Sequence, residues 1–145
     1  MTRMPWRRLV WVGLALFAAI QFVPYGHDRT NPPVVAEPRW DSPATRALAQ
    51  RACFDCHSHE TQWPAYARVA PVSWLIAHDV TDGRAALNFS AWQPPRESEV
   101  VPKEVRNAEM PPWIYTLMHG TARLSEAERR ALADGLAATI KVPGS

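Results

Sequence analysis

The sequence predicts an all-α fold in which short helices are joined by long, proline-rich loops and preceded by one N-terminal transmembrane helix. The 14 prolines among 145 residues are too many for long uninterrupted helices or a large regular sheet. Apolar residues recur at helical spacing beside capping residues, and no alternating run indicates a strand. With 47% apolar residues, the chain is expected to form one compact domain rather than two.

The N-terminus has the pattern of a membrane-targeting segment. Residues 9–23 are apolar except for Gln21, and they follow Arg3, Arg7 and Arg8. When the segment is extended to Tyr25, it provides about 26 Å of helix, enough to cross the hydrocarbon core of a bilayer. We therefore expect a retained anchor, with a cleaved signal peptide or a buried helix of a soluble protein as the alternatives.

These observations predict three regions in the chain. Residues 1–25 are the expected membrane anchor, residues 26–41 an extended linker containing three prolines, and residues 42–145 the folded domain. Basic residues flanking a membrane helix belong on the cytoplasmic side. The expected location is therefore the bacterial inner membrane, with a single pass and the domain in the periplasm.

Four segments of the folded domain are predicted to be helical. Ser42 and Pro43 supply an N-cap and a first-turn proline for a helix that closes at Cys53. A second helix is expected from Pro71 to about Leu87, with Val72, Leu75, Ile76 and Val80 inward.

Two more helices are expected towards the C-terminus. A weaker helical pattern covers Pro102 to Ala108. Ser125 and Glu128 form a capping box at the start of the last helix. One face of that helix carries Leu132, Gly135, Leu136, Thr139 and Ile140, and the glycine predicts a close approach by another helix.

The charge distribution argues against a nucleic-acid partner. Of the 16 Lys and Arg residues, three precede every acidic residue, which leaves 13 in the body of the chain against 14 Asp and Glu. Nucleic-acid binding requires a basic stripe that neutralises phosphates. The body of this chain has neither an excess of basic residues nor a dense cluster of them.

The only two cysteines lie three positions apart and are followed by a histidine, in Cys53-Phe54-Asp55-Cys56-His57. This is the pattern of c-type haem attachment, in which each thiol bonds one haem vinyl and the adjacent imidazole ligates the iron. We therefore predict one covalently bound haem c in a small cytochrome c-like domain. The alternatives are a redox pair without its usual βαβ setting, a zinc site that lacks two ligands, and a structural disulfide.

A second iron ligand is expected from the loop that contains Met110. Two prolines follow this methionine and prevent a helix from running through it. A thioether opposite histidine gives iron a raised reduction potential suited to electron transfer, although most methionines only fill gaps in a core. His119 is the main rival ligand, followed by Met118, His78 and His59, and an open position is the remaining alternative.

The chain resembles the bacterial haem-binding domain family of small, membrane-anchored proteins with a single Cys-x-x-Cys-His motif. The resemblance covers most of the chain in an ordered series. Its segments are His27 to Pro33, Cys53 to Pro64, Ala70 to Leu75, Leu87 to Ser90 with Trp92, Met110 to Tyr115, His119, and Arg123 to Ser125. The resemblance implies a periplasm-facing c-type haem domain, with related modules fused to peroxidase-like cytochromes.

Carried over residue by residue, the resemblance supports Cys53, Cys56 and His57 as haem-binding residues and Met110 as the further iron ligand. The sequence departs from the family pattern after His119, where a proline and an acidic residue are expected. We expect an electron carrier rather than an enzyme, partnered by redox proteins, with peroxidase-like cytochromes among the candidates. The alternatives are a peroxidase-like module or accessory with a labile sixth ligand, and a membrane-anchored haem sensor.

Overall fold

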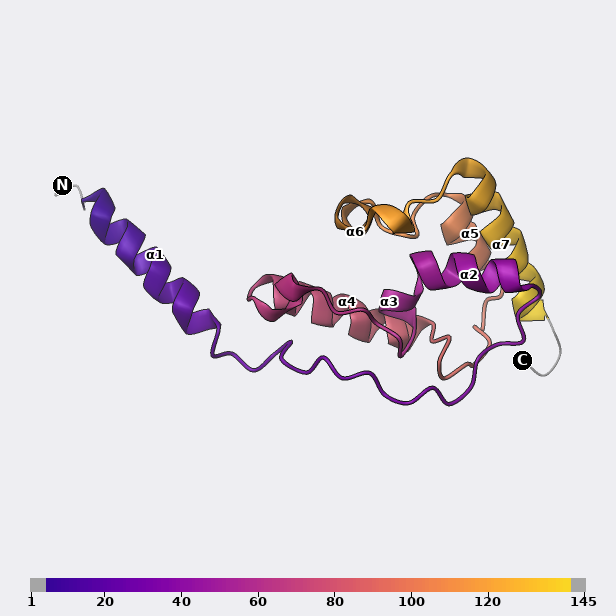
Figure 1. Cartoon of the computed structure of the whole chain (residues 1–145), viewed down its shortest axis with the longest axis horizontal. Helices are drawn as coiled ribbons and strands as arrows, with labels where there is room; N and C mark the ends of the chain where they lie inside the picture. Colours follow the sequence, from indigo (N-terminus) through magenta and orange to yellow (C-terminus); the bar gives the residue numbers. More distant parts are fainter. Residues whose placement is uncertain (1–4, 142–145) are drawn as a thin grey trace. The chain divides into compact units, whose positions relative to one another are not determined.

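The computed structural model describes residues 5–141, and the regular elements within them are helices joined by long irregular segments (Figure 1). No strand occurs in this range, where Ala36 and Ala91 form an isolated parallel bridge. The α-helices are α1 (Trp6–Ile20), α2 (Pro43–Ala52), α3 (Phe54–His57), α4 (Val72–Ala86), α5 (Val100–Arg106), α6 (Trp113–Met118) and α7 (Glu126–Lys141). Two 3₁₀ turns, η1 (Ala65–Arg68) and η2 (Gly120–Ala122), complete the order.

The predicted N-terminal transmembrane helix is wrong. Between residues 5 and 141 no helix combines the length and the apolar character needed to span a bilayer. Helix α1 has 15 residues and ends at Ile20, because Gln21 turns to the backbone of Ala70 and Pro24 cannot continue a helix. The Gln21 amide donates to the Ala70 carbonyl at 3.1 Å and accepts from the Ala70 N–H at 2.9 Å.

The predicted single pass through the inner membrane depended on that helix and is therefore also wrong. The apolar run of residues 9–23 includes Gln21, whose amide binds the Ala70 backbone instead. Arg3, the first arginine of the expected targeting signal, lies outside the described residues.

The chain divides into two compact units. One comprises the chain up to Thr30 together with Trp63–Asp79, and the other comprises Asn31–Gln62 and the chain from Val80 onward. In the first unit, Gly26 has a positive φ of 75°, and a Cβ there would lie 2.7 Å from the Ser73 carbonyl oxygen. Close backbone contact of this kind packs the residues after α1 along the start of α4.

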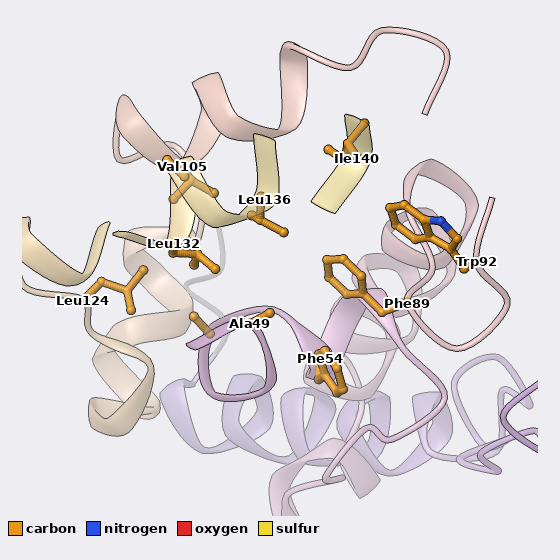
Figure 2. Close-up of a cluster of buried hydrophobic side chains, with 11 residues drawn as sticks. Ala49, Phe54, Phe89, Trp92, Val105, Leu124, Leu132, Leu136 and Ile140 are labelled. Atoms are coloured by element: carbon orange, nitrogen blue, oxygen red, sulfur yellow. The ribbon is translucent and has the colours of Figure 1, made fainter. Parts of the chain in front are cut away.

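The second unit contains the main hydrophobic core. Helix α7 packs on both α2 and α5. Figure 2 shows buried side chains of these helices in one cluster with Phe54, Phe89 and Trp92. The predicted inner face of α7 is confirmed, since Leu132, Gly135, Leu136, Thr139 and Ile140 are all buried.

The predicted helix caps are confirmed. The Thr45 N–H donates to the Ser42 hydroxyl at 3.2 Å, and Pro43 begins α2. Glu128 accepts from the Ser125 N–H at 2.8 Å, while the Glu128 N–H donates to the Ser125 hydroxyl at 3.3 Å. Each cap satisfies backbone donors that the first turn of a helix leaves without partners.

The inward face predicted for the helix after Pro71 is only partly correct. Val80 is buried, but Val72 and Leu75 are exposed. The segment after Met110, expected to be a loop because of its two prolines, contains helix α6. Pro112 instead occupies the N-cap position of this short helix, where a missing backbone N–H costs nothing.

Candidate functional site

The Cys-x-x-Cys-His motif forms a single helical turn, α3, directly after α2. The Cys53 N–H donates to the Ala49 carbonyl at 2.8 Å, so Cys53 ends one helix and caps the next. The His57 N–H then donates to the Cys53 carbonyl at 2.9 Å. Residues three and four apart share one face of a helix, and the turn therefore brings Cys53, Cys56 and His57 to the same side.

Two backbone carbonyls near the C-terminal end of α4 fix the His57 ring. The His57 Nδ1 atom lies 2.9 Å from the Gly83 oxygen and 3.1 Å from the Leu87 oxygen. Because both partners can only accept, the proton of the neutral imidazole stays on Nδ1 and the Nε2 electron pair is available to a metal. Burial lowers the pKa of His57, against the opposing effect of the two carbonyls, which favours this neutral form.

The approach of α4 to the motif depends on Gly83. A Cβ at this position would lie 2.5 Å from the Cys56 carbonyl oxygen, a distance that side chains do not reach. The predicted site residues do not include Gly83, although a glycine inside a helical pattern is a signal of close packing. Gly83 thus contributes to the site in two ways. Its missing side chain lets α4 approach the motif, and its carbonyl binds His57.

A cavity of about 870 Å³ opens beside His57 in the second unit. It lies between the end of α4, the loop that follows, and α5. Its apolar wall is formed by Ala85, Ala86, Leu87, Ala91, Pro94, Pro95, Val100, Val101 and Val105. Its polar lining residues are Arg84, Asn88, Gln93, Arg96, Glu97 and Glu104. This size and mixture are typical of sites that hold a small molecule or cofactor.

Met110 lines the same cavity as His57. It follows a left-handed helix end at which Ala108 has a φ of 62°. The Ala108 N–H donates to the Val105 carbonyl at 3.2 Å and the Glu109 N–H to the Glu104 carbonyl at 3.0 Å, the bond pattern of a Schellman motif. This turn directs the chain back across the end of α5, where Met110 is 36% exposed.

The rival ligands are placed differently. His119 caps the end of α6, where its ring stacks on Tyr115 at 4.2 Å between centroids. His59 lies between the Pro33 carbonyl and the Asn88 amide, at 2.8 and 2.9 Å. Neither residue lines the cavity, nor does the exposed Met118. The remaining rival, His78, belongs to the first unit.

The two cysteines stand on the turn beside the cavity without lining it. Burial raises the pKa of the Cys53 thiol to about 12, and the neighbouring Cys56 adds to the rise. The two thiols are not joined in a disulfide. Across the described residues, no three His, Cys, Asp or Glu side chains converge to form a metal site.

Arg84 lines the cavity, but its guanidinium binds the protein itself. It donates to the Ser58 carbonyl at 2.8 Å, to the Thr61 hydroxyl at 3.0 Å and to the Asn31 side chain at 3.1 Å. These bonds tie the segments around α3 together. Arg96, by contrast, is exposed at the rim of the cavity.

The residues present suit a covalently bound haem. The imidazole of His57 has its Nδ1 held by acceptors, and the thioether of Met110 shares its cavity. The cavity wall is largely apolar, and the two thiols are on the turn that carries the imidazole. Imidazole, thioether and thiols are the groups by which proteins hold c-type haem.

Comparison with known proteins supports haem binding. A family model described as "Haem-binding domain" matches residues 15–138, which is most of the chain. No curated protein and no solved structure matches it. The match includes the Cys-x-x-Cys-His turn, the cavity and Met110. The chain therefore belongs to the haem-binding domain family.

Proposed function

We propose that the protein is a monohaem c-type electron carrier. In this proposal Cys53 and Cys56 would hold one haem through thioether bonds, and His57 and Met110 would ligate its iron. The observation that carries the proposal is the shared cavity, which places an oriented imidazole and a methionine thioether around one apolar space. When bound, the haem supplies an iron that changes oxidation state by one electron.

The residues of the chain would tune this chemistry in distinct ways. The carbonyls of Gly83 and Leu87 keep the proton of His57 on Nδ1, which leaves Nε2 as the donor atom. The thioether of Met110 favours the reduced state and so raises the reduction potential. The apolar wall excludes water, which acts in the same direction.

A haem iron held by two protein ligands would have no position for a substrate. We therefore propose electron transfer rather than catalysis. The neighbours of such a carrier are redox proteins, and peroxidase-like cytochromes are candidates for that role. A peroxidase-like module would need an acid–base group beside the cavity on the Met110 side. The two histidines that could serve, His119 and His78, do not line the cavity.

Full-length protein made in a host with c-type haem maturation tests the proposal. Mass spectrometry of the denatured chain should show one covalently attached haem, and the visible spectrum should show low-spin iron with thioether ligation. The reduced protein should not bind carbon monoxide. A colourless chain with the mass of its amino acids alone would overturn the proposal, and rapid binding of carbon monoxide or peroxide would favour a peroxidase-like module.

Met110→Ala is the matched test of the axial ligand. We expect the variant to lose the thioether signature, to bind carbon monoxide and to have a lower reduction potential, because the iron loses a ligand that favours its reduced state. Met118→Ala is the control, since Met118 is exposed and does not line the cavity. An unchanged spectrum in Met110→Ala would exclude Met110 as the ligand.

A further inference from the structure

Helix α6 directly follows Met110 and its two prolines, yet it has little apolar packing to hold it in place. No residue of α6 is buried. Trp113 is 72% exposed, and Ile114 and Leu117 are exposed as well. A helix of this length without a buried face is not stable on its own. Something more specific must therefore determine where the Met110 segment lies.

Tyr115 supplies that contact. Its hydroxyl donates to Asp55 Oδ2 at 2.7 Å, in a partly buried position. The other carboxylate oxygen, Oδ1, accepts from the Gln62 N–H at 2.8 Å. Asp55 is thus held on both oxygens, and Tyr115 binds to an acceptor that is already fixed. Burial, together with the carboxylate, raises the pKa of Tyr115, so that its hydroxyl stays protonated and remains a donor.

The surroundings of Tyr115 favour a single orientation of its ring. The His119 ring stacks on it with an interplanar angle of 18°. His119 Nδ1 also lies 3.1 Å from the Tyr115 carbonyl oxygen, which joins the two residues through the backbone. Tyr115 points away from Trp113, because side chains two residues apart in an α-helix are separated by about 200°.

We propose that Asp55 and Tyr115 form a latch that positions the Met110 loop relative to the Cys-x-x-Cys-His turn. Asp55 stands between the two cysteines, and Tyr115 follows Met110 by five positions. The hydrogen bond between Tyr115 and Asp55 thereby connects the segment that carries one proposed iron ligand to the turn that carries the other. The expected effect of the latch on iron ligation rests on the proposed function. The existence of the latch does not.

Tyr115→Phe tests the latch, because it keeps the ring and its stacking partner but removes the hydroxyl. In the haem-free full-length chain, we expect amide hydrogen exchange at residues 113–118 to become about ten- to a hundredfold faster, the range expected for a lost hydrogen bond to a charged group. In the haem-loaded protein, we expect a weaker thioether signature, a lower reduction potential and carbon monoxide binding that the parent lacks.

Thr116→Val is the matched control. It removes a hydroxyl from the same helix, but this hydroxyl donates to the Trp113 carbonyl within α6 and does not reach Asp55. Asp55→Asn keeps an acceptor for Tyr115 without the charge and should give intermediate values for both readouts. Circular dichroism of each variant checks that the helices remain folded.

The two readouts separate the latch from the proposed function. Unchanged exchange at residues 113–118 in Tyr115→Phe would overturn the latch, whatever the spectrum shows. Faster exchange with an unchanged thioether signature would show that the latch holds α6 without positioning Met110, which also overturns the proposal. A parent protein without any thioether signature would instead overturn Met110 as a ligand, and the exchange experiment would still decide whether the latch exists.

Discussion

At the scale of single residues, the site depends on contacts so close that a larger side chain would not fit. His57 is oriented by two carbonyls at the end of α4, and those carbonyls reach it only because Gly83 has no side chain. The same imidazole is kept neutral by burial, which lowers its pKa. Orientation and protonation of the proposed ligand therefore both follow from the packing of α4 against α3.

Gly83→Ala is expected to destabilise the chain. The added Cβ would lie 2.5 Å from the Cys56 carbonyl, and a backbone atom cannot move aside as a flexible side chain can. Overpacking of this kind costs about 1–3 kcal/mol of unfolding free energy. Urea unfolding of the haem-free chain measures the loss.

The control for this experiment is Gly120→Ala. A Cβ at Gly120 would meet nothing within 4 Å, so the substitution should change the unfolding free energy little. Equal stability losses in Gly83→Ala and Gly120→Ala would contradict the close approach of α4 to the Cys-x-x-Cys-His turn.

At the scale of helices, a buried apolar face determines where a helix lies. Helix α7 lies against α2 and α5 with its apolar face buried. At Gly135 a Cβ would lie 2.0 Å from the Thr45 hydroxyl oxygen of α2, so the two helices meet at this glycine. Helix α6 is the contrast, since it lacks such a face and relies on Tyr115.

Gly135→Ala should therefore destabilise the second unit by about 1–3 kcal/mol, because the methyl group collides with Thr45. Thr45→Ala removes two of the three colliding atoms, and the double variant should lose less stability than the sum of the single variants. A double-mutant cycle from chemical denaturation measures this coupling. Strict additivity would mean that α2 and α7 do not meet at these positions.

At the scale of the whole molecule, the candidate site is assembled from segments far apart in the sequence. His57, a subset of the residues between Arg84 and Val105, and Met110 surround one cavity. The core that supports it joins α2, α5 and α7 with Phe54, which lies inside the Cys-x-x-Cys-His turn. Loss of stability in this core is thus expected to disturb the site as well.

Acid should weaken the fold through Glu128. Its bonds from the Ser125 backbone N–H and from Arg51 lower its pKa from 4.5 to about 2. Since the folded pKa lies below the unfolded pKa, the stabilising contribution is fully present above pH 4.5 and is lost as the pH falls towards 2.

Glu128→Gln should flatten this part of the pH dependence, because glutamine cannot lose a charge on protonation. Denaturant unfolding of the haem-free chain at a series of pH values between about 5 and 2 measures the slope. A slope as steep in the variant as in the parent would assign the acid sensitivity to other carboxylates, of which Glu37, with a pKa lowered chiefly by Arg46, is the first to examine.

Local sequence determined the caps of α2 and α7, the buried face of α7 and the spacing of Cys53, Cys56 and His57, because each depends on residues a few positions apart. The same local reasoning failed at the N-terminus. It counted apolar residues through Gln21, whose amide binds Ala70, and this partner lies 49 positions away.

Only the tertiary structure decided how distant residues meet. It brought His57 and Met110 to one cavity, Gly83 against Cys56, and Tyr115 to Asp55. Helical periodicity and capping depend on interactions between residues close together in the sequence, whereas these contacts depend on where packed helices direct their side chains. The sequence by itself therefore determined which chemical groups the protein carries, and the packing of α4, α5 and α6 decided how they are arranged.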